Sequence, residues 1–111
     1  MTAYALAHVH SVEFGPDIVE YLEKIDTTLE PFGGHFVFHG GEKDVVEGSW
    51  DGDLILIEFP DAAAVRAWWE SPEYLAIKHL RTDHMAADIV LFEALPAGYL
   101  AADGLKKLPA V

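Results

Sequence analysis

The sequence lacks several features that would tie it to a particular chemistry. It contains no cysteine, which excludes disulfide bonds, thiolate catalysis and zinc or iron–sulfur sites built on cysteine. It also contains no glycine-rich nucleotide-binding loop, no nucleophile-elbow serine and no metalloprotease helix motif. No cofactor is therefore predicted.

Basic residues are scarce as well. Lys and Arg together number 7, against 19 Asp and Glu, and the formal net charge at pH 7 is −12. Binding to a phosphate backbone depends on clustered Lys and Arg, so neither nucleic acid nor an anionic membrane surface is an expected partner. No apolar run approaches the length of a membrane span, and the N-terminus alternates like a strand rather than resembling a signal peptide. We therefore expect a cytoplasmic protein.

What is present is a hydrophobic chain of single-domain size. It has 111 residues, 51% of them hydrophobic, which is enough for one core. Apolar alternation or short apolar runs predict strands at residues 3–10, 35–38, 54–59 and 88–94. Helical spacing predicts a helix over residues 16–32 and a bent or two-part helix over 61–70 and 71–85, with Asp61 and Ser71 as N-caps. We expect one domain, residues 1–95, and a C-terminal tail, residues 96–111, that either packs on a partner or is loose.

The order of these elements, β-α-β-β-α-β, predicts an α+β, ferredoxin-like fold of the split βαβ type. Its antiparallel sheet would have the spatial order 4-1-3-2, with both helices on one face. The strands are apolar on both sides, whereas a sheet with one wet face should alternate apolar and polar residues. Two helices cannot cover both faces, so we predict a homodimer in which two sheets face each other. The two apolar sets are expected to be Phe36, Phe38, Ile55, Ile57, Phe59, Val90 and Phe92 on one side, and Leu6, Val37, Leu54, Leu56, Ile89 and Leu91 on the other.

A set of short motifs between Tyr4 and Glu93 resembles the family known as domain of unknown function 1330, within the dimeric α+β barrel superfamily. The motifs are Gly33-Gly34 and Gly40-Gly41 around the second strand, Glu47-Gly48 and Trp50 in the next connection, Glu58-Phe59-Pro60, and Ser71-Pro72-Glu73-Tyr74 with Arg81. His39 departs from the family, whose members often carry arginine beside these glycines. The resemblance implies the barrel and the dimer, but no particular reaction, because the fold supports many chemistries.

The candidate ligand-binding site is predicted at one end of the domain. Arg81 and His84 lie on or beside the apolar stripe of the second helix, and a buried arginine must be paired or bind an anion. One hypothesis is a small anionic or carbonyl-bearing ligand held by Arg81 in a pocket between sheet and helices. In that hypothesis His8, His39 or His84 transfer protons, and Tyr21 and Trp68 form walls. The alternative is a structural ion pair between Arg81 and a carboxylate such as Asp88 or Glu93.

No metal site is predicted. His8 and His10 face the same way on one strand and could chelate a metal with a third ligand. His39, however, is separated from them by the third strand, which places it roughly 10 Å from His10.

The sequence is consistent with two classes of function. The first is an uncharacterised, non-enzymatic dimer that binds a small molecule or acts as a stress or accessory protein. The alternative is a cofactor-independent monooxygenase or isomerase acting on a small aromatic-type substrate.

Overall fold

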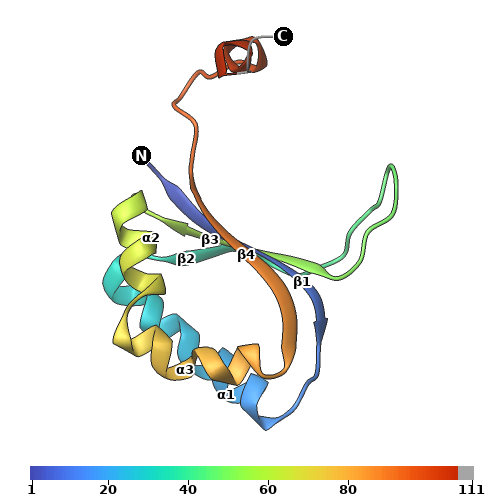
Figure 1. The fold of residues 1–111 in the computed structure, drawn as a ribbon, viewed down its shortest axis with the longest axis vertical. Helices are drawn as coiled ribbons and strands as arrows, with labels where there is room; N and C mark the ends of the chain where they lie inside the picture. Colours follow the sequence, from blue (N-terminus) through green and yellow to red (C-terminus); the bar gives the residue numbers. More distant parts are fainter. Residues whose placement is uncertain (108–111) are drawn as a thin grey trace.

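The computed structural model describes residues 1–107, and it has the predicted order of elements around one four-stranded antiparallel sheet (Figure 1). The spatial order β2-β3-β1-β4 is the predicted one. The strands are β1 (Ala3–Val12), β2 (His35–His39), β3 (Asp53–Phe59) and β4 (Met85–Glu93). The helices are α1 (Pro16–Leu29), α2 (Ala62–Trp69) and α3 (Pro72–Thr82), with short 3-10 segments η1 (Glu30–Phe32) and η2 (Ala101–Lys107). The last four residues of the predicted tail, 108–111, lie outside the described residues.

Local chemistry at the helix ends explains why the second helical region is divided in two. Asp61 caps α2 by accepting a hydrogen bond from the Ala64 N–H at 2.7 Å. Ser71 caps α3 in the same way, accepting from the Tyr74 N–H at 3.2 Å, and Pro72 follows at the first helical position. Both N-caps were predicted, because serine and aspartate satisfy free N–H groups at a helix start and proline there loses no hydrogen bond.

One predicted boundary is wrong. The second helical region was expected to reach Met85 and the last strand to begin at Asp88, but α3 ends at Thr82 and β4 begins at Met85. The extra strand residues continue the ladder along β1, which is itself longer than predicted, until Met85 pairs with Val12. Sheet pairing at a distance in sequence therefore decides this boundary rather than local helix propensity.

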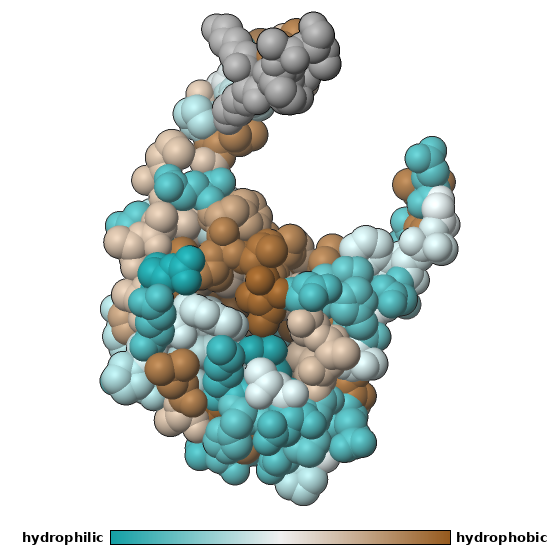
Figure 2. Space-filling view, viewed as in Figure 1, coloured by the Kyte–Doolittle hydropathy of each residue, from teal (hydrophilic) through white to brown (hydrophobic). Residues whose placement is uncertain are grey.

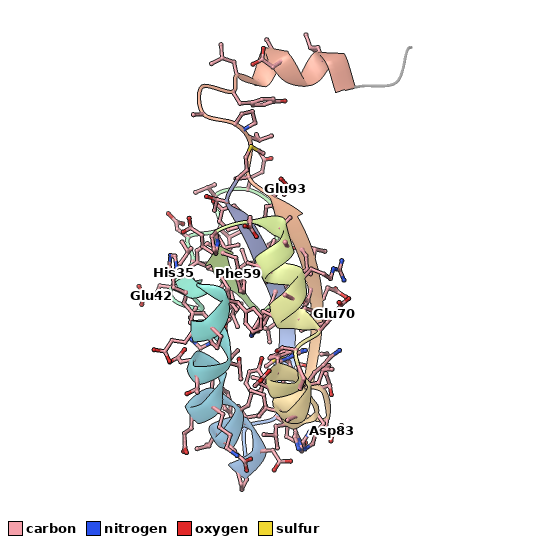
Figure 3. All side chains as sticks on the ribbon, turned by 90° about the vertical axis from the view of Figure 1, so that its left-hand side faces the viewer. His35, Glu42, Phe59, Glu70, Asp83 and Glu93 are labelled. Atoms are coloured by element: carbon pink, nitrogen blue, oxygen red, sulfur yellow. The ribbon has the colours of Figure 1, made fainter. Side chains whose placement is uncertain are left out.

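The three helices cover one face of the sheet and enclose the core (Figure 3). Figure 3 shows α1 beside α2 and α3, with Phe59 between the helices. Phe59, Trp68 and Tyr74 are almost completely buried there. The central strand β1 contributes small residues to this face, with Ala5 buried in the core and Ala7 lining a cavity. Large side chains from the helices therefore meet small ones from the sheet, and this leaves room for that cavity.

The other face of the sheet, here called the outer face, is also apolar, but its membership differs from the prediction. Phe38, Val90 and Phe92 lie on the outer face together with Leu6, Leu54 and Leu56, whereas Ile89 and Leu91 face the helices. In β2 the reason is a bulge between Phe36 and Phe38, which shifts the alternation by one residue. In β4 the pairing of Leu6 with Val90 fixes the side. Val90 and Phe92 are 52% and 44% exposed.

Two segments project from the body on the side of the outer face (Figure 1). One is the connection between β2 and β3, residues 40–52, and the other follows β4 and contains η2. Figure 2 shows apolar surface, in brown, gathered over the sheet between these two segments. Within residues 1–107, no helix has the length and apolar character needed to cross a membrane.

Candidate functional site

A cavity of about 70 Å³ lies between the sheet and the helices. Its walls are mostly apolar and come from β1, β2, β3, β4 and all three α-helices. Four side chains besides the tryptophans bring polar atoms to it, namely Tyr21, His39, Tyr74 and Arg81. An apolar cavity with a few convergent polar groups is the common form of a small-molecule site.

A wider hollow of about 310 Å³ adjoins this cavity and is more open to solvent. His39, Ile18, Leu22 and Met85 are among the residues that border both spaces. The outer rim of the hollow includes Phe14, Gly40, Gly41 and Asp53. The hollow therefore forms an entrance, and His39 stands where the entrance meets the inner cavity.

Arg81 is the charged residue of the cavity, and it is only 7% exposed. Its Nε–H donates to the hydroxyl oxygen of Tyr74 at 3.3 Å, and the Tyr74 hydroxyl is hydrogen-bonded to the Tyr21 hydroxyl at 2.9 Å. No carboxylate of residues 1–107 forms an ion pair with it. The predicted alternative of a structural ion pair is therefore wrong, since Asp88 lies on the outer face beside His10 and Glu93 lies at the far end of β4.

The Tyr21 and Tyr74 hydroxyls are hydrogen-bonded to each other, so one of them donates within the pair and the O–H group of the other is left to donate to a ligand. Burial raises the pKa of Tyr21, and the neighbouring Tyr74 raises it further, while Arg81 acts in the opposite direction. Tyr21 therefore keeps its proton at neutral pH. A guanidinium removed from water is costly unless an anion or several hydrogen-bond acceptors meet it. Arg81 with the Tyr21–Tyr74 pair can hold an oxygen atom that carries full or partial negative charge.

The structure brings four of the six predicted site residues to this cavity and places the other two elsewhere. Arg81, Tyr21, His39 and Trp68 all line it. Trp68 is buried as a wall, and its indole N–H donates to the Thr28 hydroxyl at 3.0 Å. His39 faces inward because of the bulge at Val37, which reverses the alternation of β2 just before it.

His8 and His84 do not border the cavity. His8 lies on the outer face, because the alternation of β1 turns it away from the helices and pairs it with Leu54 and Asp88. The His84 ring lies between the carboxylates of Asp17, at 2.9 Å, and Glu13, at 3.2 Å. These hydrogen bonds raise the pKa of His84, and they join the start of α1 to the turn after α3.

Tyr74 is a polar cavity residue that the predicted site did not include. It stands seven residues before Arg81, which is two helical turns, so the two side chains share one face of α3. That spacing was the available signal. A separate group on the outer face, His8, His10 and Asp51, has the side-chain atoms and spacing to hold a metal ion.

Comparisons with known proteins place the chain in a family and a fold. The family model described as Domain of unknown function (DUF1330) matches residues 2–95. Among curated proteins, no sequence matches the chain. The structure resembles RPA0582, a protein of unknown function from Rhodopseudomonas palustris, with a TM-score of 0.65 and 16% identity over 86% of this chain and 83% of that one.

Two further solved structures show the same fold. A dimeric ferredoxin-like protein of unknown function from Jannaschia sp. CCS1 has a TM-score of 0.64 at 14% identity, covering 85% of this chain and 100% of that chain. SnoaB, a cofactor-independent oxygenase from Streptomyces nogalater, has a TM-score of 0.52 at 17% identity, covering 87% of this chain and 94% of that chain. The predicted ferredoxin-like α+β fold is confirmed.

Proposed function

The chain belongs to the family described as Domain of unknown function (DUF1330), and on that premise we propose that it binds a small molecule carrying an anionic or carbonyl oxygen. The observation that carries the proposal is Arg81, a buried cation beside an apolar cavity with no carboxylate partner among residues 1–107. A protein gains stability by removing such a charge, so a buried, unneutralised guanidinium is evidence for a ligand that supplies the missing negative charge.

The walls define the rest of the ligand. Aromatic rings from Tyr21, Phe36, Trp68 and Trp69 line the cavity, together with aliphatic side chains. Such walls favour a flat, largely apolar body. The inner space of about 70 Å³ accepts a small group, and a larger body extends into the adjoining hollow of about 310 Å³. The ligand class is therefore an aromatic or enolisable compound with one oxygen directed at Arg81.

A second candidate function is catalysis without a cofactor, by oxygenation or isomerisation of such a compound. Its support is the combination of a buried cation with a histidine at the cavity entrance. Arg81 would stabilise an enolate or phenolate, and His39 would accept the proton. The fold is also that of SnoaB, which is a cofactor-independent oxygenase, although likeness at this identity concerns the fold and not the reaction.

We also propose that the chain is a homodimer formed through the outer face of the sheet. The outer face is apolar and exposed at Phe38, Val90 and Phe92, and exposed apolar patches of this kind mark interaction sites. The similar Jannaschia protein is dimeric. Light scattering after size exclusion should give a dimer mass, and Leu56→Asp, in the middle of this face, should give a monomer. A monomeric wild-type protein would contradict the proposal.

The binding proposal is tested by native mass spectrometry and calorimetry on the purified protein. Native spectra report any small molecule that is retained, and titration with matched aromatic carboxylates, phenols and amides reports which oxygen is preferred. Arg81→Ala should leave the fold intact and abolish binding, while Arg66→Ala, which alters an exposed arginine near Glu70, should bind normally. Binding that persists in Arg81→Ala would refute the proposal. Oxygen uptake with the phenols in air separates the catalytic candidate from simple binding.

A further inference from the structure

We propose that His8, His10 and Asp51 form a binding site for a divalent transition-metal ion of the zinc class on the outer face of the sheet. None of the three residues borders the cavity, so this inference goes beyond the proposed function and does not depend on it. The ligand set is two imidazoles and one carboxylate, which suits zinc, nickel, copper and iron better than the oxygen-seeking calcium and magnesium.

The ligand atoms already have the spacing that a metal ion requires. Asp51 Oδ1 lies 3.3 Å from His8 Nε2 and 3.3 Å from His10 Nδ1. All three ligand atoms lie within 4.8 Å of one another. Zinc bonds of about 2.0–2.1 Å in a tetrahedron separate neighbouring ligand atoms by about 3.3–3.4 Å. The two edges at Asp51 Oδ1 therefore match the spacing of a zinc site.

The fold holds these three side chains together. His8 and His10 project from the same side of β1, and their ring centroids are 4.1 Å apart. The Trp50 ring stacks on His8 at 4.4 Å with an interplanar angle of 9°. Gly52 follows with φ of 71°, and a Cβ atom at this position would overlap the carbonyl oxygen of Val9. The turn that carries Asp51 is thus pressed against β1, where only glycine permits the approach.

A second carboxylate stands behind one of the ligands. His10 Nε2 lies 2.9 Å from Asp88 Oδ2, while Nδ1 faces Asp51. When His10 Nδ1 binds a metal ion, Nε2–H donates to Asp88, which is the usual outer-shell partner of a metal-binding histidine. Without metal, the two ring nitrogens of His10 hydrogen-bond to the carboxylates of Asp51 and Asp88.

His8 also contacts the turn that carries Asp51, because His8 Nε2 lies 2.8 Å from the Asp51 backbone carbonyl oxygen. This contact holds the His8 ring beside the Asp51 carboxylate, whose Oδ1 lies 3.3 Å from the same nitrogen.

The test uses the untagged, full-length protein after removal of metal with a chelator. Titration with zinc chloride in a non-coordinating buffer should show one ion per chain, and cobalt should give the intense visible absorption of a tetrahedral site. Asp51→Asn and His10→Ala should each weaken zinc binding at least about tenfold, and Asp88→Asn about 10- to 100-fold. The matched control is His35→Ala, an exposed histidine beside Glu58 on the same face, which should leave zinc affinity unchanged.

Equal zinc affinity in the wild type and in Asp51→Asn would overturn the proposal, as would an equal loss in His35→Ala. Asp51→Asn preserves the size of an exposed side chain, so loss of folding should not obscure the result, and circular dichroism verifies this. Asp51→His supplies another ligand atom at the same place and should retain binding. If it does not, while Asp51→Asn binds normally, the cluster is a hydrogen-bonded network only.

Discussion

Replacing Arg81 with methionine should stabilise the unliganded protein. The substitution keeps side-chain length and apolar volume and removes a buried charge. It loses the hydrogen bond from Arg81 Nε to the Tyr74 hydroxyl, which contributes about 1 kcal/mol, but Tyr74 keeps its bond to Tyr21. It also removes a desolvation penalty of about several kcal/mol, since no carboxylate of residues 1–107 offsets it. We expect the free energy of unfolding to rise by about 1–3 kcal/mol.

This increase is large enough to measure by two methods. For a chain of this length, about 1 kcal/mol shifts the melting temperature by about 4 °C. Urea unfolding and calorimetry should therefore both show it, at one fixed protein concentration, because the stability of a dimer depends on concentration. Arg66→Met is the control. Arg66 is exposed and 3.8 Å from Glu70, and its replacement should change stability by less than about 0.5 kcal/mol.

The result that refutes this reasoning is a loss of stability. If Arg81→Met unfolds more easily than the wild type by about 2 kcal/mol or more, the guanidinium stabilises the resting fold, and the ligand hypothesis loses its main support. If the variant is more stable and also loses the ligand-induced rise in melting temperature, Arg81 is kept for binding at a cost in stability.

Three further predictions concern other parts of the structure. Thr28→Val should lower the free energy of unfolding by about 1–3 kcal/mol in urea titrations, because it leaves the buried indole N–H of Trp68 without its acceptor. His84→Gln should change the pH dependence of the melting temperature. The pKa of His84 is raised above 6.5 in the folded protein. The extra stability of the wild type over His84→Gln should therefore be complete below about pH 6.5 and disappear as pH rises through the folded-state pKa. Equal melting curves at pH 5.5 would contradict this. Gly52→Ala should lower the free energy of unfolding by about 1 kcal/mol or more in thermal unfolding, because its Cβ atom would overlap the Val9 carbonyl oxygen. The same displacement should reduce zinc binding in calorimetry. Normal zinc binding in this variant would show that the metal site does not depend on the position of the turn.

Patterns in the sequence predict this fold well because its local and long-range signals agree. Asp61 and Ser71 stand at helix starts whose free N–H groups they satisfy, and the strand order follows from the order of elements. The assignment of faces is where prediction fails. The bulge at Val37 depends on pairing with β3. A strand with apolar residues on both faces has no alternation of polar and apolar residues that would reveal such a bulge.

The site could be predicted only in part, because two of the six predicted residues, His8 and His84, lie away from the cavity. Helical spacing correctly marks Arg81 as buried. His39 was predicted as a site residue, and it reaches the cavity because the bulge changes the alternation of β2. Asp51 was missed for another reason. It precedes β3, which runs antiparallel to β1 and ends its ladder with Val9 opposite Asp53. That register places Asp51 beside His8 and His10. The placement follows from the pairing of β1 with β3, and the spacing of residues along the sequence does not reveal it.

The distribution of charge narrows the class of ligand further. The protein carries a formal net charge of −12, so the outer field opposes the approach of an anion. Inside, Arg81 favours negative charge, and Tyr21, whose pKa is raised by burial, remains protonated. A multiply charged ligand would meet repulsion outside and apolar walls within. A phenol, an enolisable ketone or a similar compound that enters neutral satisfies both regions, since it develops negative charge on one oxygen only after reaching the guanidinium.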